Sequence, residues 1–123
     1  MVNVLDKIIE DKKESLKTIK KIYSLNSIET TIKSLNNFLN FKEVIANNKG
    51  ASLITEIKKA SPSAGELVKN FNHLNIAKTY VDNGATCLSV LTEEKHFLGK
   101  LDYIRDIKNK FKICLLYTSD AAD

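Results

Sequence analysis

The later part of the chain alternates between strand-like and helix-like segments, and this alternation limits the possible folds most strongly. Residues 85–91 are almost continuously apolar, which is typical of a strand buried in a parallel sheet. Residues 52–58 and 113–116 also have strand character, and apolar residues at helical spacing lie between the three segments at 74–81 and 101–111. The order strand–helix–strand–helix–strand predicts a parallel sheet with right-handed crossovers.

The residues before this alternation have helical patterns. Residues 2–22 place apolar and charged side chains on opposite faces of one helix. Asn26 and Glu29 have the spacing of a helix cap, so we expect a second helix to begin there. Its apolar spacing continues to Ile45, and Gly50 is suited to end it.

The predicted organisation is a helical extension at residues 1–50 followed by the first β/α units at 51–113. Two architectures fit these units: a (β/α)₈ barrel and a doubly wound sheet. No GxGxxG motif follows the first strand, which argues against a dinucleotide-binding sheet. A closed barrel needs roughly 200 residues or more, so the barrel interpretation makes this 123-residue chain a fragment.

Charge and composition exclude several partners. Of the 19 basic residues 18 are lysines, and they alternate with acidic residues instead of clustering as arginines do in nucleic-acid binders. We therefore expect no nucleic-acid partner. No apolar run approaches 18 residues and the N-terminus lacks a signal-peptide pattern, so we expect a cytoplasmic protein with no membrane contact.

The metal-binding residue types have no useful spacing. Cys87 and Cys114 form no CxxC motif, so neither a disulfide framework nor a zinc ribbon is expected. His73 and His96 have no cysteine or aspartate at ligand spacing, and we expect no metal site.

Glu56 and Lys58 are the first candidates for chemistry. Both fall on one face of a short apolar strand, near the end at which parallel α/β proteins place their sites. Unpaired charges in a central strand would cost several kcal/mol, roughly, so a functional pair is one interpretation. The other is a solvated edge strand with a weak ion pair. The strand pattern alone leaves both open.

Two segments after the predicted strands add further candidates. Ser61 and Pro62 begin a small-residue run ending at Gly65, which could present hydroxyl and N–H groups to an anion or form an ordinary turn. Phe97 follows the second strand, so it lies at the same edge of the sheet. It could line a site for a planar substrate or pack beneath its own loop.

Two long motifs resemble one enzyme family. Residues 53–63, with the sequence LITEIKKASPS, and the later Gly65 resemble the first-strand signature of indole-3-glycerol phosphate synthase. Residues 88–99, with the sequence LSVLTEEKHFLG, resemble the second-strand block of the same family, and the first helix is similar to its N-terminal helix. The resemblance covers about residues 3–112.

The resemblance implies a (β/α)₈ TIM barrel with an extra N-terminal helical extension. It implies ring closure and decarboxylation of 1-(2-carboxyphenylamino)-1-deoxyribulose 5-phosphate, in the biosynthesis of L-tryptophan, by a carboxy-lyase without metal or organic cofactor. The implied partner is thus a small phosphorylated substrate. Fusion or association with another tryptophan-pathway enzyme is also compatible with it.

The same resemblance assigns roles to individual residues. Glu56 matches the catalytic first-strand acid that orients the substrate and the catalytic lysine. Lys58 matches the lysine that adds positive charge beside the anionic substrate, and Ser61 and Pro62 match the mobile first loop. Phe97 matches the aromatic residue that packs on the anthranilate ring.

The chain departs from the family after its third strand begins. The family continues with a Lys-Asp-Phe motif that carries the general acid, whereas no lysine follows Lys112 here. The ending resembles a translated sequencing-adapter tail, so we expect residues 114–123 to be foreign to the protein. The general acid and the general base are absent, and we expect the fragment to be inactive. The alternatives are a self-contained Lys-rich binding module and another phosphate-binding barrel such as phosphoribosylanthranilate isomerase.

Overall fold

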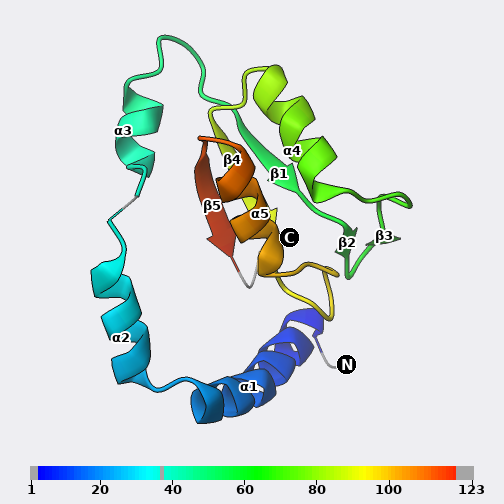
Figure 1. The fold of residues 1–123 in the computed structure, drawn as a ribbon. Coiled ribbons are helices and arrows are strands. Elements are labelled where there is room, and N and C mark those ends of the chain that lie inside the picture. The colour runs from blue at the N-terminus through cyan, green and yellow to red at the C-terminus, as the bar shows by residue number, and fades with distance from the viewer. Residues whose placement is uncertain (1–2, 37, 119–123) are drawn as a thin grey trace. The chain divides into compact units, whose positions relative to one another are not determined.

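The computed structural model of the chain describes residues 3–36 and 38–118 and divides it into two compact units. The units are residues 1–38 and 39–123, and each is described by itself (Figure 1). In the described residues, no helix combines the length and the apolar character needed to cross a membrane.

The first unit consists of two helices. Helix α1 spans Val4–Ile22 and helix α2 spans Leu25–Ser34. The predicted helix cap at Asn26 is wrong, because Ser24 caps α2 by accepting a hydrogen bond from the backbone N–H of Ser27 at 3.1 Å.

The predicted second helix is in fact two helices. Helix α2 ends at Ser34, and Leu35 has extended backbone angles. Helix α3, at Phe41–Ala46, begins anew in the second unit. Its cap is Asn40, whose side chain accepts a hydrogen bond from the N–H of Glu43 at 3.2 Å. Asparagine bonds to local backbone in this way at the expense of a continuous helix, although the apolar spacing runs through the break.

The second unit is built on a three-stranded parallel sheet with the strand order β1-β4-β5. Its strands are β1 (Ile54–Ile57), β4 (Cys87–Leu91) and β5 (Cys114–Thr118). The crossovers contain helix α4 (His73–Asp82) and helix α5 (Asp102–Lys110). The predicted alternation and the parallel sheet are confirmed.

One face of this sheet carries the apolar core. Ile57, Leu88 and Val90 are fully buried there, and they form one cluster with Ala77 of α4 and Ile107 of α5. Both crossover helices therefore cover the same face (Figure 1). A doubly wound sheet carries helices on both faces, whereas a barrel wall carries them on the outside alone. The arrangement favours the barrel.

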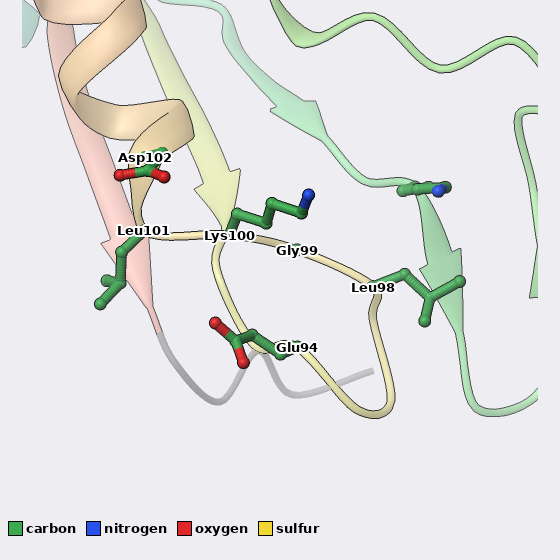
Figure 2. Close-up of a pocket in the computed structure, with 7 residues that line it drawn as sticks. Glu94, Leu98, Gly99, Lys100, Leu101 and Asp102 are labelled. Atoms are coloured by element: carbon green, nitrogen blue, oxygen red, sulfur yellow. The ribbon is translucent and has the colours of Figure 1, made fainter. Parts of the chain in front are cut away.

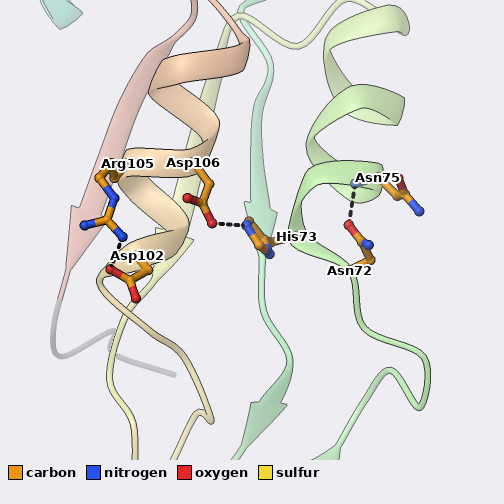
Figure 3. Close-up of polar contacts among 6 residues, drawn as sticks. All are labelled: Asn72, His73, Asn75, Asp102, Arg105 and Asp106. Atoms are coloured by element: carbon orange, nitrogen blue, oxygen red, sulfur yellow. Dashed lines mark hydrogen bonds and ion pairs between the residues drawn. The ribbon is translucent and has the colours of Figure 1, made fainter.

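A polar and aromatic contact joins the two crossover helices. The Nε2 atom of His73 in α4 lies 2.9 Å from Oδ2 of Asp106 in α5 (Figure 3). The His73 ring also stacks on Tyr103 of α5 at 4.3 Å between ring centroids. His73 thus has a structural role between the helices.

The segment at 59–70, which holds the small-residue run from Ser61 to Gly65, contains a short hairpin. Strands β2 (Ala60–Ser61) and β3 (Gly65–Glu66) pair antiparallel directly after β1. Gly65 has a φ of 69°, a conformation that glycine adopts without strain. The hairpin was missed because two-residue strands have no detectable periodicity.

The predicted division at residue 50 and the foreign origin of residues 114–123 stay predictions. Within that tail, residues 114–118 form β5, and residues 119–123 lie outside the described residues.

The chain returns across the end of β4 at Gly99. A Cβ atom added there would lie 2.3 Å from the carbonyl oxygen of Leu91 and 2.9 Å from the carbonyl carbon of Thr92. These are backbone atoms, so no side-chain rotation can relieve the overlap.

Gly99→Ala is therefore expected to lower the free energy of unfolding by about 1–3 kcal/mol, as overpacking does elsewhere. Gly50→Ala is the matched control, because nothing lies within 4 Å of the added Cβ, and it should stay within about 0.5 kcal/mol. Urea unfolding of both variants, made in the complete enzyme, measures the difference, and equal midpoints would contradict the close approach.

The two cysteines lie side by side on adjacent strands. Cys87 and Cys114 are register partners, both buried and both free thiols. Burial, with a smaller contribution from Cys114, raises the pKa of the Cys87 thiol from 9.0 to about 11.

Because the thiolate is the nucleophile, Cys87 should react slowly with iodoacetamide at pH 8 in the folded protein. A rise of two pKa units lowers the thiolate fraction about a hundredfold at that pH. We expect alkylation to be about 100 times faster after guanidinium unfolding, as followed by peptide mass spectrometry. Equal rates in the folded and unfolded protein would show that this thiol is not buried.

Candidate active site

The candidate site lies at the carboxyl edge of the parallel sheet. Strand β1 ends at Ile57 and leads into the β2–β3 hairpin, while β4 ends at Leu91 and leads into an irregular segment at 92–100. Because parallel strands end at the same edge, both connections meet there. Tyr80 of α4 donates a hydrogen bond to the carbonyl oxygen of Glu56 at 3.3 Å, which anchors the end of β1.

Glu56 and Lys58 form an ion pair at this edge. Lys58 Nζ lies 3.1 Å from Glu56 Oε1, and the side chains are 21% and 43% exposed respectively. Glu56 and Ser89 are register partners, so Glu56 faces away from the helix-covered core with Ile54. A pair this exposed contributes about 0–1 kcal/mol to stability. Its position therefore has more bearing on a ligand than on the fold.

Phe97 lies next to this pair. Its side chain is 1% exposed, and Lys58 Nζ is 5.9 Å from the centroid of its ring. That distance is within the range of a cation–π interaction. The backbone brings the segment here through a hydrogen bond from the N–H of Ala60 to the carbonyl oxygen of Phe97 at 3.2 Å.

Ser61 and Pro62 lie on the hairpin. Ser61 is 6% exposed, and its Oγ accepts a hydrogen bond from the N–H of Ala64 at 3.2 Å and lies 3.3 Å from Ser63 Oγ. The hydroxyl therefore closes the turn of the hairpin. Pro62 is half-buried beside it. The Ala60 contact joins this hairpin to the Phe97 segment.

A residue that the sequence did not single out organises this segment. The carboxylate of Glu93 accepts hydrogen bonds from three consecutive backbone N–H groups. Its own carbonyl oxygen accepts a fourth, from the N–H of Gly99 at 2.7 Å. The one available signal was its position directly after an apolar strand and within a run that has no helical or strand periodicity.

An open cavity of about 490 Å³ borders the same segment. Its lining combines Lys59 with Glu94, Leu98, Gly99 and Lys100 of the segment and with Leu101 and Asp102 at the start of α5. Figure 2 shows Leu98 to Asp102 in succession along the chain that leads into α5, with Glu94 earlier on the same connection. The cavity has both acidic and basic side chains, which suits a polar ligand.

Within residues 3–36 and 38–118, no three His, Cys, Asp or Glu side chains gather as a metal site would require. His73 instead contacts Asp106, as described above.

The predicted site residues thus fall into two connected groups. Glu56, Lys58 and Phe97 form a contiguous cluster, whereas Ser61 and Pro62 lie on the hairpin that is bonded to it. Their roles toward a substrate stay predictions.

Comparisons with known proteins agree with these motifs. A family model described as indole-3-glycerol phosphate synthase matches residues 5–119. The chain is 42% identical over 113 residues to the indole-3-glycerol phosphate synthase of Desulforamulus reducens, covering 92% of this chain and 43% of that protein. It is 43% identical over 106 residues to that of Clostridium acetobutylicum, covering 85% and 40%. A third relative, from Aliarcobacter butzleri, is 40% identical over 116 residues, covering 92% and 44%.

The chain spans less than half the length of these curated relatives. The predicted fold class is confirmed, because the family has a TIM barrel and the sheet here has the matching parallel order. By its sequence over residues 5–119, the chain belongs to the indole-3-glycerol phosphate synthase family.

Proposed function

We propose that this chain is part of an indole-3-glycerol phosphate synthase, a carboxy-lyase of L-tryptophan biosynthesis. Its reaction closes the ring of 1-(2-carboxyphenylamino)-1-deoxyribulose 5-phosphate and removes the carboxylate as carbon dioxide. The observation that carries the proposal is the Glu56–Lys58 ion pair beside Phe97, at the carboxyl edge of a sheet whose sequence matches this family. We further propose that the enzyme acts in the cytoplasm on this small phosphorylated molecule, with no nucleic-acid or membrane partner.

The charges of the cluster suit this substrate. It carries a carboxylate and a phosphate, and Lys58 contributes an ammonium group at the edge of the sheet. The carboxylate of Glu56, 3.1 Å away, fixes the direction of that ammonium group. The ring of Phe97 lies 5.9 Å from that ammonium group and is 1% exposed in this structure, so packing of the substrate's aromatic part on it requires the ring to become exposed on binding.

The residues of this chain bind and orient; proton transfer needs further groups. In the family that the chain resembles, a third-strand lysine and a fourth-strand glutamate serve as general acid and base. The chain has no lysine after Lys112 to serve as that acid. Proton transfer therefore depends on residues of the complete protein, and Glu56 and Lys58 prepare the site for them.

Glu56→Gln in the complete enzyme is expected to lower kcat by roughly two orders of magnitude, as when a preorganised charge is lost. Lys58→Ala should raise KM and also lower kcat, because it removes the ammonium group that faces the anionic substrate. Steady-state fluorescence assays of indole-3-glycerol phosphate formation measure both effects.

Lys108→Ala is the matched control for Lys58→Ala, because Lys108 is an exposed lysine on α5. It should leave kcat/KM unchanged. Near-normal kcat/KM in both Glu56→Gln and Lys58→Ala would refute the assignment of the site.

The 123-residue chain on its own is expected to show no turnover and no cooperative melt. Its described part holds three strands of the parallel sheet, whereas the closed barrel has eight. The same fluorescence assay tests for turnover, and circular dichroism during heating tests for a cooperative melt. Measurable turnover would contradict the expected inactivity of the chain, and a sharp melt without turnover would favour a self-contained binding module.

A further inference from the structure

We infer that Glu93 is a positioning residue of this site, acting through Phe97; this rests on the function proposed above. Glu93 Oε1 accepts a hydrogen bond from the N–H of Lys95 at 3.0 Å. Glu93 Oε2 accepts two more, from the N–H of His96 at 2.6 Å and from that of Phe97 at 3.1 Å. One carboxylate thus holds three consecutive backbone groups, and the last of them belongs to Phe97.

A carboxylate is well suited to this task. Residues 92–100 form neither helix nor strand, so their N–H groups lack the regular partners of those structures. An ionised carboxylate offers about four acceptor positions on two oxygens, and its hydrogen bonds are stronger than neutral ones. A glutamine offers one acceptor oxygen and an NH₂ group that repels the N–H donors. The charged form therefore defines the path of the backbone.

The surrounding backbone bonds make the segment a closed loop around Glu93. Gly99 donates its N–H to the carbonyl oxygen of Glu93 at 2.7 Å, so the chain returns to where it started. Leu98, between Phe97 and Gly99, has a φ of 54°, which is uncommon for a residue with a side chain. The loop thus adopts a conformation that needs support, and the Glu93 carboxylate supplies it at its centre.

This loop determines where the Phe97 ring lies. From the loop, the carbonyl oxygen of Phe97 bonds to Ala60 of the hairpin, and its ring lies 5.9 Å from Lys58 Nζ. Glu93 bonds directly to the backbone N–H of Phe97, and through this residue it acts on the cluster that includes Lys58. A misplacement of about 1 Å in a positioning residue can cost a hundredfold in rate.

The test uses Glu93→Ala and Glu93→Gln in the complete enzyme. We expect kcat/KM to fall about 10- to 100-fold in Glu93→Ala, with most of the loss in KM, because a displaced ring weakens substrate binding. Glu93→Gln keeps one acceptor oxygen and should recover part of that loss. Glu29→Ala, which removes an exposed glutamate from α2, is the control and should match the wild type.

A double-mutant cycle separates positioning from general stabilisation. We expect Phe97→Leu to lower kcat/KM by itself, and adding Glu93→Ala to it should cost less than about threefold more if Glu93 acts through Phe97. Additive losses would overturn the inference, because Glu93 would then act independently of the ring.

Amide hydrogen exchange provides a readout that does not depend on activity. Exchange at Lys95, His96 and Phe97 should speed up at least tenfold in Glu93→Ala and less in Glu93→Gln, while the amides of β4 stay protected. Unchanged exchange at these three amides would overturn the inference even if activity fell. An inactive wild-type enzyme with faster exchange in Glu93→Ala would refute the proposed function and leave the positioning of the loop standing.

Discussion

The packing of both crossover helices against one face of the sheet governs the rest of this structure. Ile57, Leu88 and Val90 are buried beneath Ala77 and Ile107. Because side chains alternate along a strand, burying these residues directs Ile54, Glu56 and Ser89 to the opposite face. A slip of one residue in the pairing would bring Glu56 under α4, where an unpaired carboxylate is costly. Burial of the apolar face therefore determines that Glu56 lies on the opposite face of the sheet.

The elements with a clear period were predictable from the sequence. Two-residue spacing predicted Glu56 and Lys58 on one face of a strand; β1 ends at Ile57, so Lys58 directly follows the strand, and the two side chains are paired at 3.1 Å. The apolar run at 85–91 contains β4, and the helical spacing at 74–81 lies within α4. Motif resemblance gave the family, which the match over residues 5–119 confirms. Helices and strands were predictable where buried residues recur at a regular spacing, because that spacing leaves a regular pattern of apolar residues in the sequence.

The features without a period were not predictable in the same way. The break between α2 and α3 depends on a local side-chain bond of Asn40, while the apolar spacing runs through it. The three hydrogen bonds of Glu93 depend on the path of an irregular loop, and no spacing encodes such a path. Ser61 had two interpretations, anion contact or turn, and in this structure its hydroxyl serves the turn. These contacts become visible only when the backbone is known.

The backbone hydrogen bond from Ala60 to Phe97 has a mechanical consequence. It links the hairpin that carries Ser61 and Pro62 to the loop that carries the aromatic ring. A hairpin that lifts to admit a molecule must either break this bond or pull the ring along with it. Entry of a ligand past the hairpin and packing of its planar part on the Phe97 ring would then occur together. Any movement of the hairpin would thereby reach the loop that carries Phe97.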